Sequence, residues 1–208
     1  MNSPCRALFI AWAIAGAALA QDAENTFQSV TVGFEVTKPA TWQFVTAEQN
    51  LESLKQTKLD DKEFHKLMLK YATAPLVAIM KHPEPFDDLN PSFKVNIKPF
   101  GQMKGSGPKE ILTILSGQFE KLFKDYRVTM RPVDTLVSGL PAGYMRVQYN
   151  LETSEGRSFP VTSELWIVPR GDYFFMIGAG TRQDEVTGTR KEIREILKTV
   201  KIISVENP

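Results

Sequence analysis

Residues 80–93, MKHPEPFDDLNPSF, hold the densest group of chemically capable side chains in the chain. His82 is one of two histidines, and Glu84, Asp87 and Asp88 follow it closely. The prolines at 83 and 85 favour extended backbone, in which residues 82 and 84 point the same way. His82 and Glu84 therefore predict one corner of a metal site. Zinc needs three or four converging ligands, so a third would have to come from elsewhere in the fold.

The same stretch has a simpler interpretation as a solvated connection between two strands. Asp87, Asp88 and Asn90 stand just before Pro91, and residues of these types are typical turn formers. These preferences favour the connector over the metal site, and both hypotheses stay open.

Other kinds of catalysis find less support in the sequence. A Ser-His-Asp site needs a histidine, and besides His82 there is only His65, which lies in the charged surroundings of Lys62, Glu63 and Lys66. The chain has no G-x-S-x-G nucleophile motif. Hydrolysis by paired carboxylates stays open, because it depends on spatial separation rather than on a motif.

The Gly-rich stretch 101–110, GQMKGSGPKE, invites comparison with a phosphate-binding loop because it precedes a predicted helix. It lacks the G-x-x-x-x-G-K-[ST] spacing, and Pro108 removes an amide where an anion would need one. We interpret it as the start of the helix, with Ser106 as N-cap and Glu110 near the positive end of the helix dipole.

The N-terminus has the layout of a secretory signal peptide over residues 1–20. Arg6 precedes an apolar run at 8–15, and residues 18–20 form an A-x-A cleavage box. We expect cleavage after Ala20, a single domain over residues 21–208, and a periplasmic or secreted protein without a transmembrane segment after cleavage.

Cleavage would remove Cys5, the only cysteine, and with it any disulfide or thiolate chemistry. Lys and Arg total 25 and Asp and Glu total 24, so the net charge is close to zero. No polybasic run marks a nucleic-acid partner and no motif implies a cofactor, so we expect neither. A protein partner or a small ligand stays open.

Hydrophobic periodicity outlines the elements that would position these residues. Helical spacing predicts helices over 47–73, 105–126 and 184–203, and alternation or apolar runs predict strands over 30–36, 74–81, 92–100, 127–138, 140–152, 159–169 and 173–181. The last two strands form a hairpin that is apolar on both faces, which predicts burial on both faces. Core packing explains these side chains more simply than a ligand pocket does. The predicted fold class is α+β, an antiparallel β-sheet flanked by helices on both faces in an α/β/α sandwich.

The order and pattern of these elements resemble the PsbP-like fold superfamily, including the DcrB-like bacterial secreted proteins. The segments that carry the resemblance are VGFEVTKPATWQF, LNPSFKVNI, GLPAGYMRVQYNLETSEGR, YFFMIGAGT and the closing helix. The resemblance implies an antiparallel sheet between helices. It implies little about function, because members act as accessory, assembly or binding proteins with unlike partners.

These observations predict an exported, non-enzymatic binding or accessory protein of the cell envelope. A small-ligand or metal carrier is the alternative, and a carboxylate-dependent hydrolase is a weaker one.

Overall fold

The computed structural model describes residues 24–50, 57–58, 74–184 and 186–203, and within them the chain is mostly β-strand. A three-stranded sheet has the order β1-β2-β11, with bounds Thr26–Ser29, Phe34–Thr37 and Lys201–Ile202. No helix among the described residues is long and apolar enough to cross a membrane.

The second sheet has eight strands in the order β3-β5-β6-β10-β9-β8-β4, with β7 also paired to β8. Its strands are β3 (Gln43–Phe44), β4 (Thr57–Lys58), β5 (Val77–Met80), β6 (Ser92–Pro99), β7 (Lys124–Val137), β8 (Leu140–Thr153), β9 (Ser158–Arg170) and β10 (Tyr173–Arg182). All pairings are antiparallel, and the predicted final hairpin is β9–β10, in which Tyr173 pairs with Arg170.

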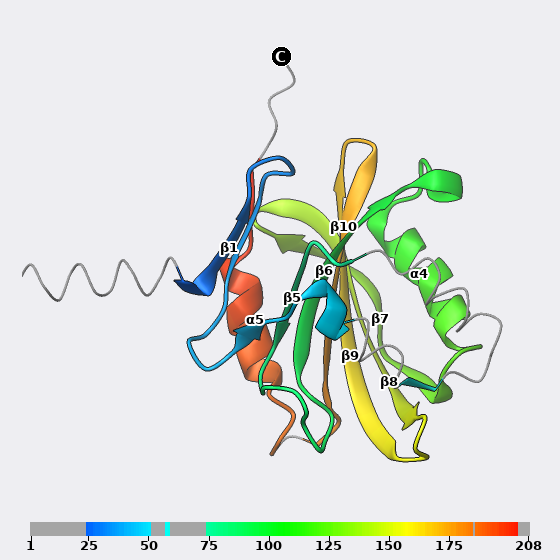
Figure 1. Cartoon of the computed structure of the whole chain (residues 1–208). Helices are drawn as coiled ribbons and strands as arrows, with labels where there is room; N and C mark the ends of the chain where they lie inside the picture. Colours follow the sequence, from blue (N-terminus) through cyan, green and yellow to red (C-terminus); the bar gives the residue numbers. More distant parts are fainter. Residues whose placement is uncertain (1–23, 51–56, 59–73, 185, 204–208) are drawn as a thin grey trace, which may run out of the picture.

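The main hydrophobic core lies between the two sheets. Phe34 and Val36 of β2 pack with Trp166 and Phe175 of the large sheet, and all four are buried. Helix α5 (Arg190–Thr199) contributes to the same core through a stripe of apolar side chains, Ile193, Ile196 and the following Val200. Figure 1 shows β1 and α5 together on one side of the large sheet.

A smaller core lies on the opposite face of the large sheet, under helix α4 (Pro108–Phe119). Ile111 and Leu112 of α4 pack on Leu165, Ile167 and Phe174, which alternate along β9 and β10 with the residues of the main core. The two-sided burial predicted for this hairpin is therefore confirmed in the described residues, and its side chains form core rather than a ligand pocket.

The predicted α/β/α sandwich is wrong, because the chain folds as a mostly β structure with two sheets, a β-sandwich. The layer over the main core contains the sheet β1-β2-β11, which the sequence periodicity did not separate from the rest. The helix expected at 105–126 ends at Phe119, and β7 begins at Lys124. Most of the helix expected at 47–73 lies outside the described residues.

The continuous strand expected over residues 30–36 is also wrong. Gly33 has φ +63° and its amide donates to the carbonyl of Val30 at 3.2 Å, so the chain turns there and β1 pairs with β2. Glycine adopts this left-handed conformation without the steric cost that a side chain would bring. Val30 is consequently 83% exposed, whereas Phe34 is buried as expected.

Candidate functional site

The loop at residues 81–91 connects β5 to β6, and the side chain of Asn90 makes three hydrogen bonds within it. Its Oδ1 accepts from the His82 amide at 3.1 Å, and its Nδ2 donates to the His82 carbonyl at 2.9 Å and to Glu84 Oε1 at 2.8 Å. The two bonds to His82 link positions eight residues apart, and the Lys81 amide donates to the Pro91 carbonyl at 3.0 Å beside them, so Asn90 and this backbone bond together close the loop.

The two residues predicted as metal ligands, His82 and Glu84, belong to this loop and make contacts within it. Glu84 Oε2 accepts from the Phe86 amide at 2.9 Å and Oε1 accepts from the Asn90 side chain, so both oxygens of the carboxylate are hydrogen-bonded within the loop. The His82 ring stacks on the Phe86 ring with centroids 4.2 Å apart. Among the described residues, no three His, Cys, Asp or Glu side chains gather in a way that would hold a metal ion. A third ligand for His82 and Glu84 would have to lie outside them, and the metal site stays a prediction.

Two arginines from distant parts of the chain fasten the loop to the sheet. The Arg157 guanidinium donates to the Asp87 carbonyl, and Arg182 Nη1 lies 3.1 Å from Asp88 Oδ1. Arg157 comes from the β8–β9 turn and also lies over the Phe159 ring, 4.9 Å from its centroid. The acidic residues that the sequence placed in the loop therefore take part in fixing its position.

A cleft of about 710 Å³ lies between this loop and the β8–β9 turn. Loop residues 84–90 form one wall, residues 151–159 contribute the other, and Glu48 and Gln49 lie at its margin. Met80, Ser92 and Lys94 reach it from β5 and β6. We call it the 81–91 cleft. Its volume is in the range of small-molecule sites.

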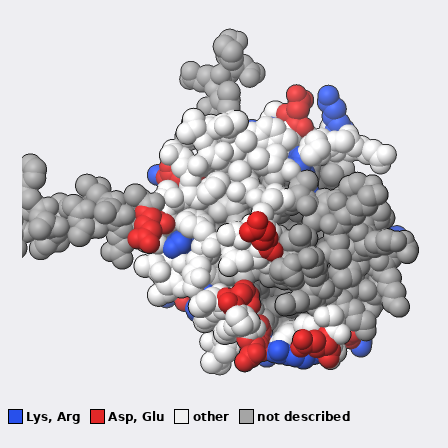
Figure 2. All heavy atoms as spheres, in the orientation of Figure 1, with Lys and Arg blue, Asp and Glu red and all other residues white. Residues whose placement is uncertain are grey.

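The charge of the 81–91 cleft is unbalanced toward acid. Two basic side chains, Lys94 and Arg157, face the cleft, against five carboxylates: Glu48, Glu84, Asp87, Asp88 and Glu155. On the described part of the surface visible in Figure 2, acidic and basic side chains form small groups, and in several of them the two kinds appear next to each other. A ligand in the cleft would therefore meet a local excess of negative charge.

Lys94 is the half-buried cation of this cleft. It lies on β6 between Phe93 and Val95, which face the main core, so its side chain lies on the opposite face of the sheet. Burial lowers the pKa of Lys94 to about 8, and the negative charge of Glu84 offsets part of that effect. Its ammonium makes no hydrogen bond or ion pair with any residue that the structure describes.

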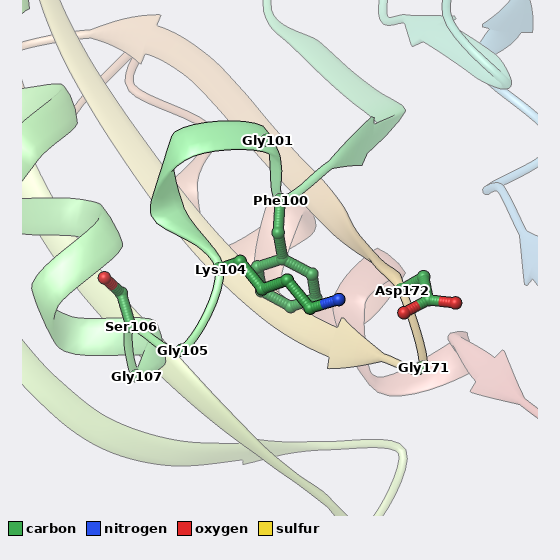
Figure 3. A pocket seen from close by; sticks show the side chains of 8 residues that line it. All are labelled: Phe100, Gly101, Lys104, Gly105, Ser106, Gly107, Gly171 and Asp172. Atoms are coloured by element: carbon green, nitrogen blue, oxygen red, sulfur yellow. The ribbon is translucent and has the colours of Figure 1, made fainter.

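A second hollow, of about 670 Å³, lies at the Gly-rich stretch 101–107 (Figure 3). There the side chain of Lys104 extends across Phe100 toward Asp172 of the β9–β10 turn. The N-cap of α4 is Gly107 rather than the expected Ser106, and the Gly107 amide donates to Glu110 Oε2 at 2.7 Å. The protein's own carboxylate thus occupies the helix end that an anion would use.

A buried polar pair that the periodicity did not single out lies on the core face of the large sheet. Glu164 is 2% exposed and accepts a hydrogen bond from the Tyr144 hydroxyl. Burial, together with the Glu164 carboxylate, raises the pKa of Tyr144 above its ordinary value. The only signal in the sequence is one acid inside the apolar run of residues 159–169.

The residues of the predicted signal peptide, and His65 with its neighbours, lie outside the described residues.

Comparison with known proteins gives likenesses of fold only. No family model matches the chain, and no curated protein matches it. LpqN of Mycobacterium tuberculosis, described as involved in cell envelope biogenesis, is 13% identical with a TM-score of 0.49, over 81% of this chain and 82% of its own. The Ran-binding protein Mog1p of Saccharomyces cerevisiae is 11% identical with a TM-score of 0.49, and the match covers 86% of this chain and 95% of Mog1p. Cyanobacterial PsbP from Synechocystis is 10% identical with a TM-score of 0.45, and the match covers 86% of this chain and 91% of that protein.

A PsbP is thus among the structures similar to this chain. The DcrB-like assignment stays a prediction. Identities this low carry no activity, ligand or partner from these proteins to this one.

Proposed function

We propose that the protein is a non-enzymatic binding protein of the cell envelope that holds its ligand in the 81–91 cleft. The observation that carries the proposal is a cleft of ligand size. The loop that forms one of its walls is held in place by hydrogen bonds and an ion pair before any ligand binds. Asn90 helps to close the loop, and Arg157 and Arg182 fasten it to the sheet. A pre-formed site loses less entropy on binding than a flexible one, so this construction favours binding.

The engagement of two of the five carboxylates at the cleft, those of Glu84 and Asp88, supports binding over carboxylate-dependent hydrolysis. A hydrolase of that kind needs two facing carboxyl groups that are free to move protons or attack substrate. Glu84 is occupied by two hydrogen bonds that shape the loop, and Asp88 pairs with Arg182. The export part of the proposal rests on the signal-peptide pattern at residues 1–20.

Ligand retention tests the binding part directly. Protein purified without denaturation from the envelope fraction of its host should show a retained small-molecule mass by native mass spectrometry. The same sample should begin at Gln21 by N-terminal sequencing if the signal peptide is removed. Turnover of a panel of ester, phosphate, glycoside and peptide substrates by the purified protein would contradict the non-enzymatic part.

Site-specific labelling then places the ligand. Cys5 is the only cysteine, so a Cys5→Ser background accepts a single new thiol. Ser154→Cys puts that thiol on the cleft wall, and Lys191→Cys puts it on exposed α5 on the other side of the sheet as a matched control. The retained ligand should slow maleimide labelling at position 154 and leave position 191 unchanged. Equal labelling at both positions with and without the ligand would refute the cleft as the binding site.

A further inference from the structure

The 81–91 cleft contains a cation whose partner is missing from the described residues. Lys94 lies opposite Ala78 of β5 and Gly178 of β10, and both neighbours are too small to cover its side chain. Glu84 acts on it only through its charge, since both Glu84 oxygens are held by Phe86 and Asn90. A half-buried ammonium without a hydrogen-bond acceptor is costly, so the fold keeps an unfavourable group at this place.

The other basic group of the cleft is already engaged. The Arg157 guanidinium donates to the Asp87 carbonyl and lies over the Phe159 ring. The N–H group that donates to Asp87 cannot hold a ligand without releasing the loop from the β8–β9 turn. Lys94 is the cationic group of the cleft that donates to no residue that the structure describes.

The remaining walls define the rest of the ligand. Apolar side chains line the cleft on both sides, namely Met80, Phe86, Leu89, Leu151 and Phe159. They suit an aromatic or aliphatic body, whereas the acidic side chains around them repel a group with several negative charges more strongly than a group with one. A carboxylate carries one charge and accepts strong hydrogen bonds from an ammonium.

We propose that the 81–91 cleft binds a small organic acid with an apolar body, and that its carboxylate is held by the ammonium of Lys94. This inference rests on the proposed binding function and adds the chemical class of the ligand. The carboxylate supplies the acceptor that Lys94 lacks, and the apolar body covers Leu151 and Phe159. Ser92, which also lines the cleft beside Lys94 on β6, offers a hydroxyl to the same carboxylate.

Matched probes test the head group. Isothermal titration of the protein with 3-phenylpropionate, its amide, 3-phenylpropylamine and 2-phenylethyl phosphate compares four head groups on one phenylethyl body. We expect the carboxylate to bind about 10- to 100-fold more tightly than the amide, which is the difference that one charged hydrogen bond provides. Equal binding of carboxylate and amide, or tighter binding of the phosphate or the amine, would overturn the proposal.

A pair of lysine variants tests the residue. Lys94→Met removes the ammonium and keeps an apolar stem, and Lys98→Met is the matched control on the same strand and face, outside the cleft. Lys94→Met should reduce carboxylate binding to the level of the amide, and Lys98→Met should leave it unchanged. Thermal unfolding checks that Lys94→Met still folds, and Lys94→Arg, which keeps the charge, should restore part of the affinity. An unchanged affinity in a folded Lys94→Met would overturn the assignment.

The labelling assay separates this inference from the proposed function. If retained host ligand protects Ser154→Cys but 3-phenylpropionate and octanoate do not, binding in the cleft stands and the carboxylate proposal is wrong. If nothing protects that position, both are wrong. Protection by the two carboxylates that is lost in Lys94→Met supports both.

Discussion

Replacing Asn90 by alanine removes a brace that helps to close the loop forming one wall of the 81–91 cleft. The substitution deletes two half-buried hydrogen bonds to the backbone of His82 and one exposed bond to Glu84. It removes no side chain from either hydrophobic core. Its effect on stability therefore reports on the loop alone.

The expected magnitude follows from these three bonds. A protein hydrogen bond contributes a net ~0.5–1.5 kcal/mol, and an exposed bond lies at the low end of that range. Two half-buried bonds and one exposed bond together give roughly 2 kcal/mol of lost stability. Asn150→Ala is a matched control, because it removes a single exposed bond to Asp125 and should cost about 0.5 kcal/mol.

Urea denaturation followed by tryptophan fluorescence measures the change in the free energy of unfolding. Amide hydrogen exchange by NMR adds local information, because the His82 amide donates to Asn90 itself and the Phe86 amide donates to Glu84, which Asn90 positions. Both amides should exchange faster in Asn90→Ala, and ligand binding in the cleft should weaken. A loss of stability no larger than that of Asn150→Ala, with unchanged exchange at His82, would refute the bracing role.

Three further outcomes follow from single contacts. Gly143→Ala would place a Cβ 2.9 Å from the backbone carbonyl carbon of Pro108, so urea denaturation should show a loss of about 1–3 kcal/mol from overpacking; an unchanged value would mean that α4 shifts without cost. Tyr144→Phe removes the donor to buried Glu164 and should cost about 1–3 kcal/mol, with partial recovery when Glu164→Gln is added; full additivity would argue against a direct bond. Because the pKa of Lys94 is lowered from 10.5 to about 8, the unfolded chain binds more protons between these values. Stability should therefore rise with pH across that window, and Lys94→Met should flatten the rise; identical pH profiles for the two proteins would contradict the lowered pKa.

The parts of the site that the sequence predicted are local. Turn-forming residues indicated a connection at 81–91, and alternation placed Lys94 on the face opposite Phe93. Both signals depend only on near neighbours in the chain. The contact between Arg157 and Asp87 spans 70 residues, and no periodicity carries information about such a pair. The cleft depends on that contact, so the sequence patterns could not predict it.

The errors in the fold have a similar cause. Val30, Phe34 and Val36 alternate in the same way whether the strand continues or turns at Gly33. Periodicity also predicts which residues of α5 face the core. It does not predict that β2 and β11 pair beside that helix. The layer on that side was predicted as helical because pairing between chain ends leaves no local trace.

The order of strands places Lys94 and two of the apolar residues of the cleft, Leu151 and Phe159, on different strands of the large sheet. On the face opposite the main core, β9 and β10 present Leu165, Ile167 and Phe174 to α4, whereas neighbouring β6 presents Lys94. Leu151 and Phe159 come from the end of β8 and the start of β9, which β10 separates from β6. The proposed carboxylate ligand, held by Lys94 over β6, would therefore have to extend across β10 for its apolar body to reach Phe159. This separation follows from the strand order, so it would persist even if Leu151 and Phe159 were exchanged for other apolar residues.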